Sequence, residues 1–200
     1  MKNCLFVIAC LISILGKSQV DFTGGLLAGG VASQISGDGL GGWDKFGVRA
    51  GGWIHMDYNG VYGTQLGIEY VNKGSAKQAD VNNGDFNQFS FRLHYVEVPI
   101  LVTYSLKNFR FGIGPSVGLL INQKVEYNGA IGDPSPPFET LDLSGNISVA
   151  WIIGDHSLLE FRGSSSFLPT RPAPAVVNKL SYYEQGNYNQ VIGLSYMFRF

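Results

Sequence analysis

Three histidines, one of them beside a serine, are the residues of this 200-residue chain whose types could support catalysis. A serine nucleophile needs a base such as histidine within hydrogen-bond reach, and His156 directly precedes Ser157. Adjacent side chains point to opposite faces of a strand, so this pair would diverge if a strand begins there. We expect His55 and His94 to face the interior of the fold. The sequence also lacks the H-E-x-x-H and glycine-rich phosphate-loop patterns, so we expect no enzymatic activity, no metal and no cofactor.

Charged side chains on one face of the predicted strands are the second group that could act together. Glu97 is predicted to point inward beside Pro99, and a buried carboxylate needs a cationic partner or hydrogen bonds to remain charged. Four arginines could neutralise it there: Arg49, Arg92, Arg162 and Arg199. We expect these residues to fill the interior as a polar plug in place of a hydrophobic core. A gate or an ion site made from the same residues is the functional alternative.

Apolar and polar residues alternate with a period of two along most of the chain, which is typical of β-strands. The last segment has an apolar and aromatic face made of Ile192, Leu194, Tyr196, Phe198 and Phe200. Eight segments of this kind are predicted, over residues 24–34, 46–58, 62–71, 89–104, 109–124, 141–153, 158–167 and 188–200. Within 89–104 the apolar positions change phase, and we expect a β-bulge near Val96.

Short and long connections alternate between these segments. An Asn-Gly hairpin signal falls in the short link 58–60, and the other short links are 106–108 and 154–156. The long links are 35–45, 73–88, 125–140 and 168–186. Tight periplasmic turns and long extracellular loops are the arrangement of bacterial outer-membrane barrels. The sequence therefore predicts an all-β fold, an eight-stranded antiparallel up-and-down transmembrane β-barrel with both termini on the periplasmic side.

The direction of the apolar face separates a membrane barrel from a soluble one, since a lipocalin also has eight alternating strands but points its apolar face inward. Charged residues make up 14% of the chain, below the roughly 25% typical of soluble domains. Aromatic residues stand at the ends of predicted strands, where interfacial girdles lie: Tyr62, Tyr70, Tyr104, Phe109, Trp151, Tyr196 and Phe200. We therefore expect the apolar face to contact lipid, and the chain to reside in the bacterial outer membrane.

Residues 1–18 have the composition of a cleaved secretory signal peptide. A basic residue precedes an apolar run over 5–15, which is too short to span a bilayer. The mature chain, 19–200, would be one barrel domain without cysteine, because Cys4 and Cys10 both lie in the leader. A lipoprotein cleavage box ending at Cys10 is the alternative. Loss of the leader takes the net charge from −1 to −3, which argues against nucleic acid as a partner.

Two internal motifs and the last five residues resemble a known family. Residues 95–104 read YVEVPILVTY and residues 112–118 read GIGPSVG. They resemble the YxEIPxLxxY stretch and the G-x-G-P-x-x-G strand of PorT-like outer-membrane barrels, which are common in Bacteroidetes. The closing YMFRF resembles the terminal strand that the barrel-assembly machinery reads, which implies that Tyr196, Phe198 and Phe200 form the assembly signal. The resemblance covers nearly all of the mature chain and implies the architecture rather than a particular role.

The leading functional hypothesis is a monomeric barrel with a lumen filled by side chains and long extracellular loops that have a structural or surface-recognition role. Surface loops often carry binding function, and the proline-rich stretches 133–137 and 169–174 would be stiff. A narrow porin for ions or small solutes is the alternative. An accessory factor in protein secretion and a lipid-modifying enzyme come after it. The expected partners are outer-membrane lipids and the barrel-assembly machinery, together with a loop ligand that these residues do not specify.

Overall fold

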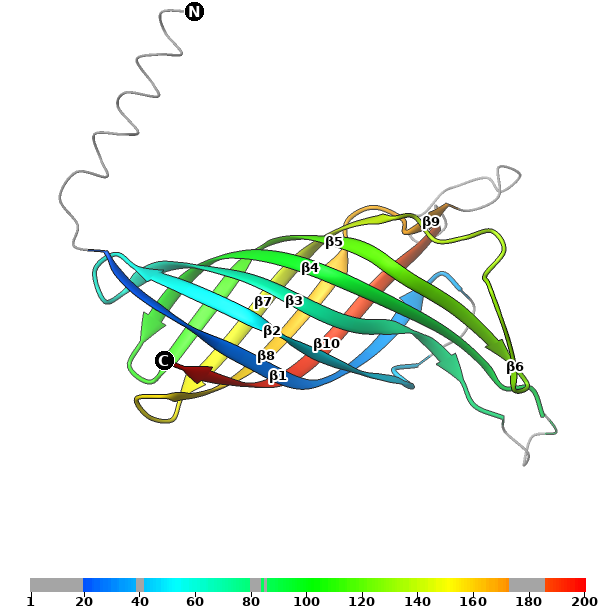
Figure 1. The fold of residues 1–200 in the computed structure, drawn as a ribbon, viewed down its shortest axis with the longest axis horizontal. Helices are drawn as coiled ribbons and strands as arrows, with labels where there is room; N and C mark the ends of the chain where they lie inside the picture. The colour runs from blue at the N-terminus through cyan, green and yellow to red at the C-terminus, as the bar shows by residue number, and fades with distance from the viewer. Residues whose placement is uncertain (1–19, 39–41, 80–83, 85, 173–185) are drawn as a thin grey trace, which may run out of the picture.

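Eight long antiparallel strands close into a ring in the computed structural model of the chain (Figure 1). The structure describes residues 20–38, 42–79, 84, 86–172 and 186–200, and the predicted leader with Cys4 and Cys10 lies outside these ranges. The long strands are β1 (Asp21–Ser36), β2 (Lys45–Asp57), β3 (Tyr62–Lys77), β4 (Phe89–Leu106), β5 (Phe109–Tyr127), β7 (Leu141–Ile152), β8 (Ser157–Ser166) and β10 (Gly186–Arg199). Two short strands are added to the ring: β6 (Ala130–Gly132) pairs with β5, and β9 (Arg171–Pro172) pairs with β10.

Pairing between the first and last strands closes the ring. β1 pairs with β2 on one side and with β10 on the other, in a register that runs from Gly25↔Arg199 to Ser36↔Tyr188. Each long strand therefore has two neighbours, as lipid requires because it offers no hydrogen bonds to an open edge. The predicted eight-stranded antiparallel barrel is confirmed. Within the described ranges, no helix is long and apolar enough to cross a membrane.

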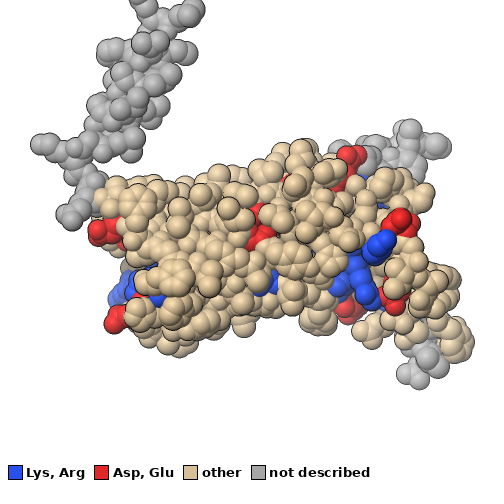
Figure 2. Space-filling model, viewed as in Figure 1, with Lys and Arg blue, Asp and Glu red and all other residues tan. Residues whose placement is uncertain are grey.

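Apolar side chains cover the outer face of the ring. The alternation of the sequence places one side chain in two on this face. Exposed members of the set include Val48, Ile68, Val102, Ile113, Ile147 and Leu194. On the side shown in Figure 2, charged residues gather toward the two ends of the barrel and the middle is largely uncharged. An apolar band of this kind would be costly in water and is the surface that contacts lipid in a membrane barrel.

The register of β4 against β5 shifts between His94 and Tyr95, close to the predicted bulge near Val96, but β4 itself alternates without interruption, so the predicted change of face within this strand is wrong. Phe91, Leu93 and Tyr95 point into the lumen and are buried there. The apolar residues of the sequence change phase because the lumen is apolar around Phe91, Leu93 and Tyr95. The first half of β4 therefore has its apolar residues inside the barrel, and the second half has them outside. The extra residue of this irregularity lies in β5, where Ile121 has no partner in β4.

β3 and β4 continue beyond β2 at the end of the barrel that carries the long connections. Pairing between β3 and β4 reaches Lys77↔Phe89, whereas pairing between β2 and β3 stops at Arg49↔Val71. β2 nevertheless stays paired with β1 as far as Lys45. The regular ladder between β2 and β3 therefore ends at Arg49, although the two backbones stay in contact as far as Gly47, where an added Cβ would lie 2.0 Å from the Asn72 carbonyl oxygen.

Three apolar clusters divide the lumen along its length. The cluster at the end with the short turns contains Leu27, Trp53, Ala150, Leu158 and Met197. The cluster in the middle contains Val31, Val71 and Val191. The cluster at the end with the long connections contains Ile35, Phe91, Leu93, Tyr95 and Phe138. Charged and polar side chains occupy the levels between these clusters, and they are the candidates for function.

Candidate functional site

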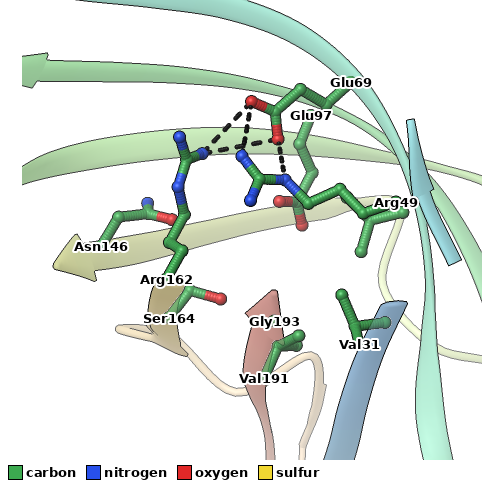
Figure 3. A pocket seen from close by; sticks show the side chains of 10 residues that line it. Val31, Arg49, Glu69, Glu97, Asn146, Arg162, Ser164, Val191 and Gly193 are labelled. Carbon is green, nitrogen blue, oxygen red and sulfur yellow. Dashed lines mark hydrogen bonds and ion pairs between the residues drawn. The ribbon is translucent and has the colours of Figure 1, made fainter. Parts of the chain in front are cut away.

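Two arginines and two glutamates form a closed ring of ion pairs in the lumen. Arg49 on β2 contacts Glu69 on β3 at 2.6 Å between Nε and Oε2, and Glu160 on β8 at 2.9 Å between Nη2 and Oε2. Arg162 on β8 completes the ring, at 3.2 Å from Nη1 to Glu69 Oε1 and 2.8 Å from Nη2 to Glu160 Oε1. Figure 3 shows both guanidinium groups converging on Glu69. None of the four side chains is more than 6% exposed, so each charge depends on the others for neutralisation.

A second buried network surrounds Lys73 on β3. Its Nζ forms an ion pair with Glu97 on β4 and another with Asp142 on β7, the latter at 2.8 Å to Oδ2. Asn189 Nδ2 donates a hydrogen bond to the same Asp142 oxygen at 2.9 Å. The ammonium group also lies 4.3 Å from the centre of the Tyr95 ring, within the range of a cation–π interaction. Lys73 on β3 thus links side chains of β4 and β7 across the lumen.

The two networks leave little open space between them. The cavity that Arg49, Glu69, Glu97, Asn146 and Arg162 line with the valines of the middle cluster has a volume of about 20 Å³. A single water molecule requires roughly 10–15 Å³ measured in the same way, so this cavity holds about one.

The buried charges of the described residues balance. Four are basic and four are acidic: Arg49, Lys73, Arg110 and Arg162, with Glu69, Glu97, Asp142 and Glu160. Arg110, near the end with the short turns, lacks hydrogen-bond partners for Nε and Nη1 within the described structure. It is the least satisfied of the eight charged groups.

The connection after β6 closes the mouth of the barrel at the end with the long loops. Phe138 is 5% exposed, and its ring packs edge-on against Phe91 at 5.1 Å between centroids. The Arg171 guanidinium lies over both rings, at 5.5 Å from Phe138 and 5.6 Å from Phe91. The backbone N–H of Glu139 donates to the carbonyl of Thr170 at 2.7 Å, which holds the two long connections together. This cap packs on the apolar cluster that contains Tyr95, whose ring contacts Lys73.

The structure places the predicted plug residues in three different environments. Arg49 and Arg162 lie in the lumen but pair with Glu69 and Glu160, whereas Glu97 pairs with Lys73. Arg92 is not a lumen residue: its side chain is 49% exposed and forms an ion pair with Glu126 on the outer surface. The odd-numbered residues of β4 face inward throughout the strand, so the even-numbered Arg92 faces outward. Arg199 lies at the barrel end, where Nε donates to the Asp155 carbonyl at 2.5 Å.

Sequence reasoning missed Lys73 as a member of the interior and did not count Asp142 among the charged residues that could neutralise one another there. Lys73 was assigned to a loop because the third strand was expected to end at residue 71, but β3 continues to Lys77. A signal was present, because Glu69, Val71, Lys73 and Ser75 keep the alternation of the strand. The partners of Lys73 could not be inferred, since β7 lies far away in the sequence.

The candidate catalytic residues do not assemble. His156 Nδ1 contacts the backbone carbonyl of Arg199 at 2.9 Å, while Ser157 Oγ hydrogen-bonds with the Tyr196 hydroxyl at 2.7 Å. His55 faces the lumen as expected and contacts Thr103 Oγ1 at 2.9 Å. His94 does not, because it lies on the outer side of β4.

Residues 114–118 have the spacing G-x-S-x-G found around nucleophilic serines, which sequence reasoning missed. In hydrolases this pattern forms a sharp turn between a strand and a helix. Here it lies within β5, and Ser116 is a buried lumen residue that accepts a hydrogen bond from Asn146 Nδ2 at 2.9 Å. Among the described residues, no three histidine, cysteine, aspartate or glutamate side chains gather into a group that could hold a metal ion.

A closed ring of eight antiparallel strands, apolar outside and charged inside, defines a transmembrane β-barrel of the bacterial outer membrane. The chain belongs to the family described as outer membrane protein beta-barrel domain, which matches residues 13–170. No curated protein matches the chain.

Three solved structures are similar to this chain at low sequence identity. Neisserial surface protein A (NspA) superposes with a TM-score of 0.50 at 8% identity, over 90% of this chain and 99% of its own. Ail, the attachment invasion locus protein of Yersinia pestis, was solved in complex with the heparin analogue sucrose octasulfate. It gives a TM-score of 0.47 at 10% identity, over 90% and 99% of the two chains. OprG from Pseudomonas aeruginosa gives 0.42 at 11% identity, over 92% and 96%. At these identities the likeness concerns the fold alone.

Proposed function

We propose that this protein is a closed, non-conducting outer-membrane barrel that acts through its outer surface and extracellular loops, in a structural or surface-recognition role. The observation that carries the proposal is the filled lumen, in which two ion-pair networks enclose a cavity of about 20 Å³. The interior of an eight-stranded barrel is just wide enough to be filled by side chains. On this view the protein is monomeric, and it performs no chemistry.

The resemblance to PorT-like barrels at residues 95–104 and 112–118 is part of the same proposal. Tyr196, Phe198 and Phe200 are 47%, 43% and 74% exposed, in agreement with a terminal strand whose aromatic face is available to the barrel-assembly machinery.

A narrow porin is the second candidate, and the polar character of the lumen favours it. Conduction would require Lys73 to leave Glu97 and Asp142, or the arginines to leave their glutamates. Separating a buried ion pair leaves uncompensated charges and costs about 3–5 kcal/mol. Open states would then be rare, since 1.4 kcal/mol corresponds to a factor of ten in population.

Single-channel recording in planar bilayers tests the proposal. We expect no steady openings from the wild-type protein. Phe138→Ala should also give none, because it removes only part of the cap and leaves both ion-pair networks in place. A large porin in the same bilayer verifies the recording. Steady openings whose conductance changes in Glu97→Gln would contradict the closed lumen and establish the porin.

A further inference from the structure

A groove on the outer wall lies where the regular ladder between β2 and β3 ends. Its volume is about 640 Å³, and it extends from Asp44–Val48 on β2 and the loop before it to the ends of β3 and β4. Lys45 Nζ on β2 donates to Asn72 Oδ1 on β3 at 3.1 Å. Asn72 in turn contacts the ring of His94, which hydrogen-bonds with the Tyr70 hydroxyl at 2.5 Å. The floor of the groove is therefore a row of polar side chains on the outside of the barrel.

The groove carries an excess of positive charge. Three of its lining residues are basic, Lys45, Lys77 and Arg92, and two are acidic, Asp44 and Glu126. Figure 2 shows lysine and arginine side chains gathered toward this end of the barrel, with acidic side chains beside them, near the place where β3 ends and β4 begins.

Two of the cations have donors left for a ligand. Lys45 contacts two neutral oxygens, Phe46 O at 2.8 Å and Asn72 Oδ1, and pairs with no carboxylate among the described residues. Arg92 presents five N–H donors. Within the described structure, its Nη2 donates a hydrogen bond to Glu126. The lysine and arginine therefore offer hydrogen-bond donors that an anion could accept.

The groove stands directly above the lipid-facing band. Phe46 and Val48, which line it, are 74% and 56% exposed on the outer face. Below it the same face continues with Ile68 and other apolar side chains. Tyr70 marks the boundary, as aromatic residues do where the hydrocarbon region of a bilayer ends. Because the long connections lie at this end, the groove is at the headgroup level of the outer leaflet.

We propose that this groove binds the phosphate-bearing headgroup of an outer-leaflet glycolipid of the lipid A type. Lys45 and Arg92 would receive a phosphate, Asn72 and His94 would bond sugar hydroxyls, and the acyl chains would run down the wall over Val48 and Ile68. Charge complementarity selects an anion, and continuity with the lipid-facing surface selects a lipid over a soluble ligand. The inference does not depend on whether the lumen conducts.

The test is titration of the purified protein in detergent with lipid A, followed by native mass spectrometry to count bound lipid. Bisphosphorylated lipid A is expected to bind at least tenfold more tightly than the same lipid without phosphate groups. Lys45→Gln and Arg92→Gln should each weaken binding about fivefold, the effect of one cation at an anionic membrane surface. Glu126→Gln should instead tighten binding, because it releases Arg92 from its ion pair.

Lys107→Gln is the matched control, since it removes the same charge from a turn at the opposite end of the barrel. The affinity of this variant for lipid A should equal that of the wild type. All variants should keep the heat-dependent gel shift of a closed barrel. Three results would overturn the proposal. These are equal affinity for the phosphate-free lipid, equal weakening by Lys107→Gln, and displacement of the lipid by excess inorganic phosphate.

Discussion

Alanine at Gly29 is expected to prevent much of the protein from closing into a barrel. Gly29 on β1 lies opposite Ser195 on β10, in the pairing that joins the two ends of the chain. A Cβ atom at this position would lie 2.2 Å from the carbonyl oxygen of Leu194 and 2.5 Å from Ser195 Cα. Both contacts are with backbone, so relief requires the two strands to move apart.

The cost of moving these strands apart should be large. Overpacking alone costs about 1–3 kcal/mol. Each hydrogen bond broken between the two strands in lipid increases this cost, because no water replaces the lost partner. We expect a loss of about 3 kcal/mol or more in the free energy of unfolding, measured by urea titration of the refolded protein, together with a weakened heat-dependent shift on SDS gels.

Gly30→Ala is the control for this prediction. Gly30 adjoins Gly29 but faces outward, where the nearest atom to an added Cβ is Gly47 O at 4.0 Å. Its unfolding free energy should stay within about 0.5 kcal/mol of the wild-type value. Equal stability of the two alanine variants would show that the β1–β10 seam tolerates a side chain, contrary to the geometry described above.

Glu69→Gln is expected to destabilise the barrel by about 3 kcal/mol, at the lower end of the range for breaking a buried ion pair. Glutamine has nearly the shape of glutamate, so the substitution removes a charge without opening a cavity. Arg49 and Arg162 would then share Glu160 as their remaining carboxylate. The measurement is again the urea midpoint of the refolded protein.

The double variant Glu69→Gln/Arg162→Gln distinguishes charge from shape. It restores neutrality to the ring, so we expect it to be more stable than Glu69→Gln alone, with a coupling energy within the 0.5–3 kcal/mol range seen for residues in contact. Lys124→Gln, which breaks an exposed ion pair with Asp133, should change stability by about 1 kcal/mol or less. If the double variant were less stable than both single variants, the ring would not be held by charge balance.

The sequence predicted the architecture because a period of two is visible in any strand with one lipid-facing side. The strand count, the antiparallel order and the outer faces of β5 and β10 all followed from that alternation. β4 was misread because Phe91, Leu93 and Tyr95 face an apolar part of the lumen, so apolar residues occur on both of its faces. Hydrophobicity alone does not distinguish an inward aromatic residue from a lipid-facing one.

The ion-pair partners could not be predicted because they depend on which strands lie across the lumen. Arg49 and Glu69 come from neighbouring strands, where a hairpin register could suggest the contact. Glu160 joins them from β8, and Asp142 reaches Lys73 from β7. No spacing along the chain encodes these distances, because they are fixed by the curvature of the closed ring.

The balance of four basic and four acidic side chains among the buried residues that the structure describes has an electrical consequence. A potential across a membrane does work on net charge that moves through it, about 2.3 kcal/mol for each elementary charge per 100 mV. If the buried networks shifted together along the barrel axis, the net charge displaced would be zero. A potential across the membrane therefore exerts no net force on these eight buried charges taken together.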